Sequence, residues 1–558
     1  MADATSPRWS ISSLATMLLT AVAFAVAYGQ APLYFSNGNQ YFLHGMAAAD
    51  YGDLHNDWLA GTIDPTPAFS ALVFATTLYL HPWAFYLYYG ILQCAYALAM
   101  IGLFAFLAGK AKAVWGWPVF AALMVLVHAA ATHWAVDRLL KHDYADRLFT
   151  GVAEQFVLGH IFQPSAFGVL LVVALCLFAH GRPLLAAVFA ALAADAHATY
   201  LVPAGLLTLG FLAALGKEGR GRMSMAVGAV ALVVVLPGAL FPVLTFGPTS
   251  PETYAEAQRI LAYDRIPHHA LPQLWLHKPA MAQVIWTALG IAMTWRTRLF
   301  LPLLVPFGGA IVLTGLQIAT DSPTLALIFP WRISVVLVPV ATTVILARIV
   351  ALWLLPLGNT AARVAAAVVL VALAGAGCWI EAERFRRYAD EKEVPLMEFV
   401  SAHRAPGDVY FLPMKIPDLM KTYEIPDNFQ RFRLETGAAI YVDFKSIPYK
   451  DVEVLEWWSR LRQTQAVEDK IHAGRLAEAV ADLSHMGVTH LVQPASHPLA
   501  GPLVHQVYAD DHYRLYQLKA LTGNGQADAK VLNPRIGGME PEEGVVALSS
   551  GGSGTSAA

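Results

Sequence analysis

The stretch YLVPAGLLTLGFLAALGKEGRGRMSMAVGAVALVVVLPGALFPVLTF, residues 200–246, shows how this chain is built. Two apolar runs, 200–215 and 223–246, flank a short basic turn at 217–222. Runs of this length approach or reach the roughly 20 residues that a helix needs to cross the hydrocarbon core of a bilayer. The pattern therefore predicts two membrane helices joined by a turn rich in Lys and Arg.

The composition extends this reading to the whole chain. Of its 558 residues, 57% are hydrophobic and 14% are charged, whereas soluble domains average about 45–50% apolar and about 25% charged residues. The formal net charge of -3 leaves no basic surface for nucleic acid. The three cysteines, which all lie inside apolar runs, indicate neither a disulfide framework nor a Cys-based zinc site. We therefore expect a polytopic, α-helical membrane protein.

About eleven apolar runs are long enough to be interpreted as spans. They cover residues 11–29, 83–108, 115–132, 165–179, 184–196, 200–215, 223–246, 281–295, 299–318, 333–355 and 361–380. The run at 69–80 is shorter and is expected to be a re-entrant or half-depth helix.

The short basic turns and the N-terminus fall on one side of this arrangement. The positive-inside rule makes that side the cytoplasm, although the cluster Arg384, Arg386 and Arg387 taken alone favours the opposite orientation. The bias is measured over short loops, so the short turns weigh more. The loops 31–69, 133–164, 247–280 and 319–332 and the C-terminal region are then expected on the far side.

The composition from about residue 388 onward becomes that of a small soluble domain. Strands are predicted at 408–413, 438–444 and 489–494, with a hairpin at 507–519, because these runs are rich in β-branched and aromatic residues. Helices are predicted at 452–463 and 474–487, and Gly487 is expected to cap the second one. The predicted domains are a transmembrane region at 1–385, an α/β domain at 386–520 and a tail without structure at 521–558.

The first outer loop, residues 31–69, carries carboxylates that are too costly for the hydrocarbon core. Asp53, His55 and Asp57 lie within five residues of one another, and such a cluster can supply a general base to an acceptor hydroxyl. Asp57 is the first candidate for the base, Asp53 is the second, and His55 is an accessory residue. The alternative interpretation is that these are ordinary solvated loop acids.

The second outer loop repeats the acidic pattern. Asp143, Asp146 and Glu154 offer oxygen ligands that could hold Mg²⁺ or Mn²⁺ against a phosphate, and Gln163 is a candidate accessory residue. The spacing matches no known metal motif, so an amphipathic interfacial helix is the stronger interpretation.

Three further candidates lie at the predicted outer ends of spans. Asp195 and His197 are either functional ionisable residues or helix caps that mark the membrane boundary. Arg332, in the segment FPWRISVVLVP, presents a fork of donors that suits a phosphate; the alternative is an interface anchor beside Trp331. We expect Arg332, with His197, to bind the phosphate of a lipid carrier.

The soluble domain contains a dense polar set within residues 431–461. An acceptor site would need such a set, and a strand edge with its salt bridges would look much the same. Its members are Arg431, Arg433, Asp443, Lys445, Glu456 and Trp457.

This layout resembles the GT-C class of glycosyltransferases, which take a sugar from a polyprenyl-linked donor on the extracytoplasmic face. The shared features are an outer loop with acids after the first span, about eleven to thirteen spans, further acidic outer loops, an arginine near a late span and a C-terminal α/β domain. In that class an acidic residue usually opens the first loop, whereas here the stretch SNGNQYFLHG carries Asn37, Asn39 and Gln40. The acidic role then passes to Asp53 or Asp57. Residues 432–461 also resemble the C-terminal part of uncharacterised bacterial membrane proteins related to this class.

The resemblance implies an inverting glycosyltransferase in the cell inner membrane, with its C-terminal domain in the periplasm. Its donor would be a polyprenyl-phosphate sugar, and its acceptor a glycan, a lipid or a protein. Two other functions remain open: a transporter or flippase for a lipid-linked glycan, and a non-catalytic scaffold of a glycan-assembly complex. A transporter usually shows paired half-repeats, which this sequence lacks.

Overall fold

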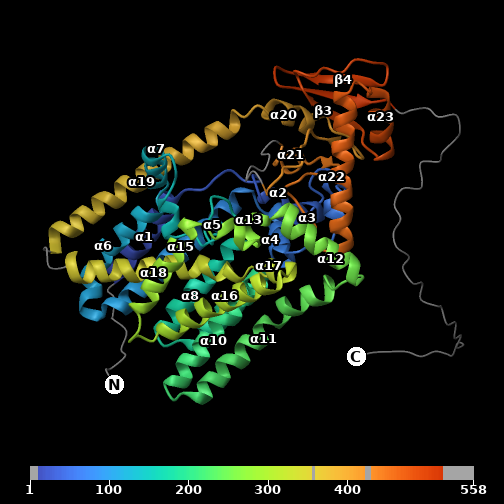
Figure 1. The fold of residues 1–558 in the computed structure, drawn as a ribbon. Helices are drawn as coiled ribbons and strands as arrows, with labels where there is room; N and C mark the ends of the chain where they lie inside the picture. Colours follow the sequence, from blue (N-terminus) through green and yellow to red (C-terminus); the bar gives the residue numbers. More distant parts are fainter. Residues whose placement is uncertain (1–10, 355–358, 421–428, 520–558) are drawn as a thin grey trace, which may run out of the picture. The chain divides into compact units, whose positions relative to one another are not determined.

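A computed structural model of the chain describes residues 11–354, 359–420 and 429–519. The tail predicted at 521–558 lies outside these residues. Helices dominate the part before the sheet (Figure 1). They are α1 (Ile11–Tyr28), α2 (Gly38–Tyr41), α3 (Leu43–Ala48), α4 (Pro67–Tyr79), α5 (Trp83–Ala108), α6 (Lys110–His128), α7 (Ala130–Leu140), α8 (Val169–Ala179), α9 (Pro183–Ala196), α10 (Leu201–Lys217), α11 (Gly221–Thr245), α12 (Pro251–Arg259), α13 (Pro267–Ala270), α14 (Pro272–Trp275), α15 (Lys278–Ala292), α16 (Phe300–Thr320), α17 (Pro323–Leu327), α18 (Ser334–Ile349) and α19 (Asn359–Ala389).

Each of the eleven predicted apolar runs forms a helix, and the short run at 69–80 forms the 13-residue helix α4. Within the described residues, six helices are long and apolar enough to cross a membrane, or seven if the bent pair α6 and α7 is one span. Four shorter apolar helices include α8 and α9. The chain is therefore a helical membrane protein, while the number of spans stays a prediction.

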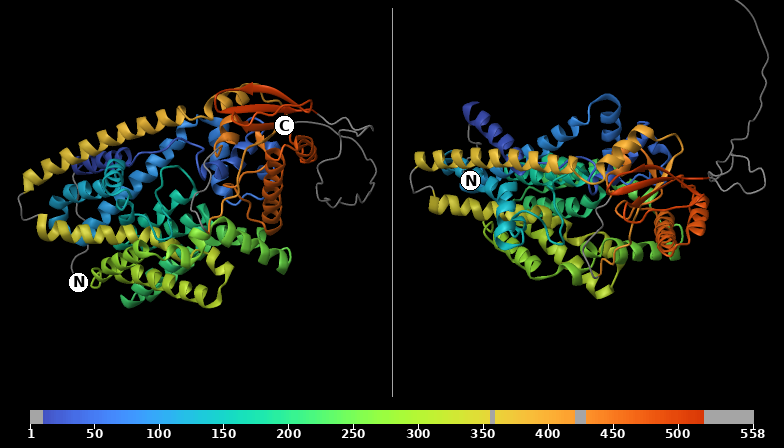
Figure 2. Two further views of the ribbon diagram at one scale, coloured as in Figure 1. Left: turned by 45° about the horizontal axis from the view of Figure 1, so that its top comes forward. Right: turned by 90° about the horizontal axis from the view of Figure 1, so that it is seen from above.

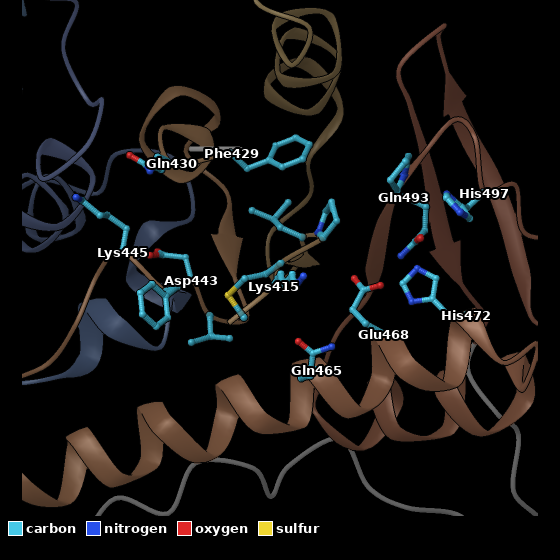
Figure 3. A pocket seen from close by; sticks show the side chains of 16 residues that line it. Lys415, Phe429, Gln430, Asp443, Lys445, Gln465, Glu468, His472, Gln493 and His497 are labelled. Carbon is cyan, nitrogen blue, oxygen red and sulfur yellow. The ribbon is translucent and has the colours of Figure 1, made fainter. Parts of the chain in front are cut away.

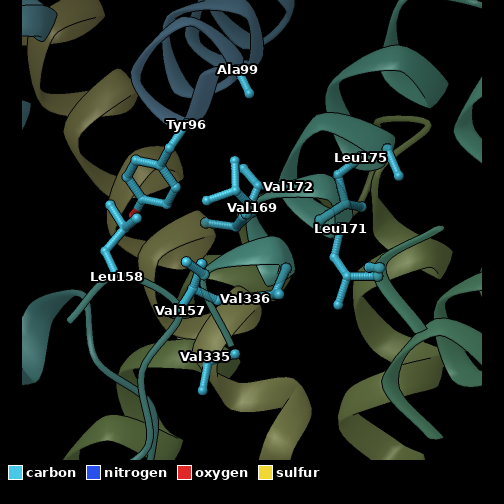
Figure 4. Close-up of a cluster of buried hydrophobic side chains, with 14 of the residues drawn as sticks. Tyr96, Ala99, Val157, Leu158, Val169, Leu171, Val172, Leu175, Val335 and Val336 are labelled. Atoms are coloured by element: carbon cyan, nitrogen blue, oxygen red, sulfur yellow. The ribbon is translucent and has the colours of Figure 1, made fainter. Parts of the chain in front are cut away.

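The helices pack around a continuous apolar core. Figure 4 shows one part of it, where Tyr96 of α5 and Val172 of α8 lie close to Val336 of α18 and to Val157 of the second outer loop. The β-branched and aromatic side chains exclude solvent here, and dense packing of this kind makes even small volume changes costly. By contrast, only two residues of α11, Val227 and Ala231, are buried, as expected for a helix that faces lipid.

The C-terminal region contains a five-stranded sheet in the order β2-β1-β3-β5-β4. The strands are β1 (Val409–Phe411), β2 (Ala439–Ile440), β3 (His490–Pro494), β4 (Val504–Ala509) and β5 (Tyr513–Leu518). Strand β1 pairs in parallel with β2 and β3, while β3–β5 and β4–β5 are antiparallel. All predicted strands are therefore confirmed, including the final hairpin.

Helices cover both faces of this sheet (Figure 2). They are α20 (Val394–His403), α21 (Phe432–Thr436), α22 (Asp451–His472) and α23 (Leu476–His485). Side chains alternate along β3, so Leu491 packs with α22 and α23 and Val492 packs with α20. Gly487 follows α23 with φ +74° and Val488 N–H donates to the Leu483 carbonyl, a glycine-terminated helix end of the expected kind.

The four predicted outer loops share contacts with one another or with the C-terminal domain. Thr249 of the third loop hydrogen-bonds Asp451, and Leu327 of the fourth packs against the apolar cluster around Trp457. The backbone N–H of Ala31 in the first loop donates to a carbonyl of the second loop. These loops therefore gather on the side of the bundle that carries the domain.

Basic turns of the bundle meet each other as well. Arg298, between α15 and α16, pairs with Glu218 at 2.7 Å and donates to the carbonyl of Phe178 at the end of α8. Three of the predicted turns, after α8, α10 and α15, are thereby brought together.

Candidate functional site

Asp57 is buried in the contact between the first outer loop and strand β2. Its Oδ1 accepts a hydrogen bond from Leu59 N–H at 3.0 Å, and its Oδ2 accepts one from Ile440 N–H at 3.0 Å. The guanidinium of Arg433 lies 3.5 Å from Oδ2. Burial raises the pKa of Asp57 above its ordinary value, and Arg433 and the two N–H groups partly offset this rise. Asp57 is thus occupied in holding the loop against the domain.

Asp53 serves the same contact. Its Oδ2 accepts a hydrogen bond from Gly407 N–H of the domain at 2.8 Å, and its Oδ1 accepts one from the Asn56 side chain at 2.8 Å. His55 Nε2 lies 3.7 Å from Asp53 Oδ1, and its side chain is half exposed. The structure therefore brings the three predicted residues of this loop together, but the two carboxylates point into the docked domain.

The amides of the first loop explain why no carboxylate opens it. Asn39 Nδ2 donates to Asp443 Oδ2 at 3.2 Å and to Ser446 Oγ at 3.0 Å. Gln40 exchanges two hydrogen bonds with the backbone of Ile447. A carboxylate at position 39 would face Asp443, and two carboxylates so close repel each other. The amides thus fit the docking of the domain.

A buried ion pair continues from these amides. Arg433, 1% exposed, donates from Nη2 to Asp443 Oδ2 at 2.5 Å, so it stands between Asp57 and Asp443. Asp443 also accepts from the backbone N–H of Ser446. Arg433 and Asp443 of the predicted polar set therefore form a network with the first loop, whereas Arg431 pairs with Glu391 and Glu456 with Arg460. Asp443 and Lys445 also border an open cavity.

Arg332 and His197 both lie beside Tyr200, and their role in binding a phosphate stays a prediction. Arg332 lies in a 3₁₀ turn (Pro330–Ile333) before α18, and its guanidinium sits 5.0 Å from the ring of Tyr200, with Nη2 3.4 Å from the phenol oxygen. The buried ring of His197 lies 5.8 Å from that of Tyr200 and 6.0 Å from that of Tyr41. Burial, reinforced by Arg332, lowers the pKa of His197 to about 3, so its imidazole is neutral at physiological pH.

Arg265 of the third loop joins this group, although sequence reasoning did not single it out. It is 5% exposed, donates from Nη2 to the Lys445 carbonyl at 2.5 Å, and lies 5.3 Å from the Phe444 ring. Burial raises the pKa of Tyr41 well above its usual value, and the positive charges of Arg332 and Arg265 partly offset this rise. We call Tyr41, His197, Tyr200, Arg265 and Arg332 the basic–aromatic cluster. Among the described residues, no carboxylate lies within ion-pair distance of Arg332.

The predicted metal ligands of the second loop occupy separate local contacts. Asp143 accepts from His133 Nδ1 at 2.9 Å, Asp146 lies 3.3 Å from Arg147, and Glu154 is exposed. Within the ranges that the structure describes, no three His, Cys, Asp or Glu side chains form a metal-binding group. Mg²⁺ or Mn²⁺ binding by this loop therefore stays a prediction.

Two other candidates make hydrogen bonds within the helical bundle. Asp195, at the end of α9, accepts from the backbone N–H of Gly238 in α11 at 3.1 Å. Gln163 is buried and donates to Ser165 Oγ at 2.7 Å. The first contact fastens α9 to α11, and the second shapes the turn before α8.

A cavity of about 460 Å³ opens beyond the carboxyl ends of the three parallel strands (Figure 3). In parallel sheets, this edge is where ligands usually bind. Lining residues come from the segments after β1 and β2, from the end of β3 and from α22; they are Leu412, Pro413, Met414, Lys415, Phe429, Gln430, Val442, Asp443, Phe444, Lys445, Gln465, Glu468, His472, Gln493, Pro494 and His497.

Glu468 is the notable titratable group of this cavity. It is 6% exposed, and burial raises its pKa from 4.5 to about 7, with His472 and Gln493 opposing the rise. A carboxyl group with such a pKa in a cavity is a candidate functional residue. Sequence reasoning missed it, although the spacing of Glu468 and His472 by four residues in a helix was a usable signal.

Comparison with known proteins adds one match. Residues 420–464 match a family described as a domain of unknown function, DUF6798. The matched segment contains Arg433 and Asp443 and six residues that line the cavity. No curated protein matches the chain.

Proposed function

We propose that this protein is an integral membrane glycosyltransferase that transfers a sugar from a polyprenyl-phosphate donor to an acceptor on the extracytoplasmic face. The observation that carries the proposal is the basic–aromatic cluster. Two arginines from separate loops lie near two tyrosines and a neutral histidine where the helical bundle adjoins the C-terminal domain: Arg332 contacts the Tyr200 ring, and Arg265 is close enough to Tyr41 to affect its pKa. A phosphate carried on a lipid fits cations placed at such a junction.

The finer topology belongs to the same proposal. All eleven predicted spans would cross the bilayer, the basic turns joined by Arg298 would lie in the cytoplasm, and the domain would lie in the periplasm. The gathering of the outer loops at the domain supports this alternation.

In this proposal Arg332 and Arg265 offset the charge that develops on the leaving phosphate. The acceptor oxygen attacks the anomeric carbon from the opposite face, the bond from that carbon to the phosphate oxygen breaks, and the phosphate leaves with the electron pair. The acceptor proton passes to a carboxylate. Asp53 and Asp57 point into the docked domain. Asp443 also accepts hydrogen bonds, from Arg433, Asn39 and Ser446, but it borders the cavity, so we assign this role to Asp443.

The donor site is tested by comparing polyprenyl phosphate with the matching polyprenol, which lacks the phosphate. We expect the full chain in nanodiscs to bind the phosphate more tightly, and Arg332→Gln to weaken that binding at least about tenfold, the effect of one charged hydrogen bond. Arg348→Gln is the matched control, because Arg348 lies near the other end of α18 and donates to the Met293 carbonyl. Equal binding of both lipids, or an unaffected Arg332→Gln, would contradict the proposal.

Transfer is then measured with radiolabelled polyprenyl-phosphate sugars. Asp443→Asn should abolish transfer while donor binding persists. A non-catalytic scaffold is the second candidate function, favoured by the burial of both Asp53 and Asp57. It predicts no transfer by the wild-type protein from any donor sugar, with binding of the lipid unchanged.

A further inference from the structure

We propose that the cavity at the carboxyl edge of the C-terminal sheet binds a saccharide. As the acceptor subsite this inference rests on the proposed function, and it then names a glycan as the acceptor. The binding itself is a separate property of the domain, and it can be measured without any transfer reaction.

Size and position qualify the cavity as a ligand site. Its volume of about 460 Å³ falls inside the range of about 300–1,000 Å³ that is typical of small-molecule pockets. It is bordered by residues that follow β1, β2 and β3, which is the usual ligand-binding edge of a parallel arrangement. The adjoining Asp443 connects it to the network that holds the first outer loop.

Buried polar atoms without protein partners lie in its wall. Among the described residues, Glu468 Oε1 and Gln493 Nε2 have no hydrogen-bond partner within accepted geometry, although the two residues are 6% and 1% exposed. Figure 3 shows the Glu468 carboxyl group pointing from α22 toward Gln493, with His472 beside it. The Gln493 amide is close enough to the Glu468 carboxyl group to oppose the rise of its pKa, but the two groups do not meet with good hydrogen-bond geometry. Buried polar groups are nearly always well hydrogen-bonded, so a polar ligand that enters here can complete bonds that the protein makes poorly.

The mixture of donors and acceptors favours hydroxyl groups as partners. The amides of Gln465 and Gln493 and the imidazoles of His472 and His497 can each donate and accept. A hydroxyl group also does both, so a polyhydroxylated ligand can satisfy several of them at once. The apolar part of the wall, which includes Pro413, Met414, Phe429 and Pro494, suits the C–H faces of a sugar ring.

The charges of the cavity argue against a phosphate as the ligand. The wall carries two lysines, Lys415 and Lys445, and also two carboxyl groups, Asp443 and Glu468. Asp443 pairs with Arg433, and Glu468 repels an anion whenever it is ionised. In Figure 3 the Lys445 amine points away from the group around Glu468. A neutral saccharide fits this balance better than an anion does.

The test uses the full chain in lipid nanodiscs and a panel of methyl glycosides of glucose, galactose, mannose, rhamnose and N-acetylglucosamine. Binding is measured by saturation-transfer NMR with each glycoside at about 10 mM. At this concentration a site with a dissociation constant of about 1 mM is mostly occupied. Inorganic phosphate and glycerol serve as anionic and simple polyol probes. We expect at least one glycoside to bind more strongly than either probe.

Variants assign the binding to this cavity. The double variant Gln465→Ala/His472→Ala, which changes half-buried and exposed side chains, should weaken glycoside binding at least about tenfold. Glu468→Leu, which fills the wall with an apolar side chain, should abolish it. Arg462→Ala, on an exposed position of the same helix, should leave it unchanged.

Three results would overturn the inference: no glycoside binds, phosphate binds and glycosides do not, or both cavity variants bind as the wild type does. Polyprenyl-phosphate binding is measured on the same samples. If it persists while glycosides fail, only this inference is lost; if it fails while glycosides bind, only the proposed donor site is lost.

Discussion

Glu468 makes the stability of the protein depend on pH in a direction that its environment fixes. Its pKa is raised from 4.5 to about 7 in the folded protein, so the folded state holds this proton more tightly than the unfolded state. Stability contributed by the protonated form is therefore lost as the pH rises from about 4.5 to about 7, by about 3 kcal/mol in total.

Glu468→Gln removes this titration, so we expect the variant to lose less stability than the wild type between pH 5 and pH 8. The measurement is the free energy of unfolding in detergent at both pH values. Glu478→Gln, which changes an exposed residue paired with Arg475, is the control and should behave as the wild type. Identical pH dependence in Glu468→Gln and wild type would show that Glu468 is not the group responsible.

Asp57 is expected to act on stability rather than directly on chemistry. Asp57→Ala leaves the N–H groups of Leu59 and Ile440 and one side of Arg433 without their acceptor. Removal of one partner of a buried ion pair costs about 3 kcal/mol or more. Chemical denaturation in detergent should show this loss, and limited proteolysis should show a released domain.

Asp64→Ala is the matched control in the same loop, because Asp64 accepts a single hydrogen bond, from Thr66 N–H. Its loss should be about 1 kcal/mol. Should Asp57→Ala retain wild-type stability and lose sugar transfer, the catalytic role predicted from the sequence would be restored.

At the level of elements, the packing of α1 on α19 depends on one glycine. A Cβ atom at Gly377 would lie 2.3 Å from the Val26 carbonyl oxygen and 2.7 Å from Ala27 Cα, both backbone atoms of α1. Gly375, two residues away on α19, has nothing within 4 Å of the same position. Small residues that allow such close approach are common between membrane helices.

Substitution by alanine should therefore affect the two glycines differently. Gly377→Ala forces α1 and α19 apart and should lower the thermal stability of the detergent-solubilised protein. Gly375→Ala should leave it unchanged or raise it, because alanine favours a helix over glycine by up to about 1 kcal/mol. Equal effects of the two substitutions would show that the helices do not touch at Gly377.

The elements themselves could be predicted because local patterns determine them. The apolar run that forms α11 and the strand β3, whose segment contains the β-branched residues Thr489 and Val492, can be recognised over short windows of sequence. The end of α23 was marked by Gly487, whose positive φ few other residues accept. Whether a given helix crosses the bilayer is harder to predict. The helices α8 and α9, with 11 and 14 residues, are shorter than the roughly 20 residues that a span needs.

The candidate site was only partly predictable, for a different physical reason. Arg332 and His197 were recognised because ionisable groups at the ends of apolar runs are rare. The partner of Asn39 is Asp443, 404 residues further along the chain, and no local pattern reports such a contact. Asp57 contacts Ile440, 383 residues further along the chain, so its role in docking the domain could not be predicted either. Asp53 and Asp57 looked available to a substrate, but both are buried.

On the scale of the whole molecule, α19 links the bundle to the domain. It spans 31 residues, which at 1.5 Å per residue is about 46 Å, longer than the roughly 30 Å hydrocarbon core. Its charged last part, from Glu381 onward, then lies beyond the core and leads to α20. The domain must sit on the side where this helix emerges, and the outer loops that contact it must share that side.

Cysteine labelling tests which side that is. Cys94, Cys176 and Cys378 are first replaced by alanine, and single cysteines are then introduced as Ser496→Cys in the domain and Lys217→Cys in a basic turn, both at exposed positions. With a membrane-impermeant maleimide, Ser496→Cys should react in spheroplasts of a bacterial host, and Lys217→Cys should react only after permeabilisation.

The reversed pattern would place the domain in the cytoplasm. Reaction of both in sealed spheroplasts would mean that an even number of spans separates them. Either result would remove the extracytoplasmic transfer reaction or the eleven-span arrangement on which it depends.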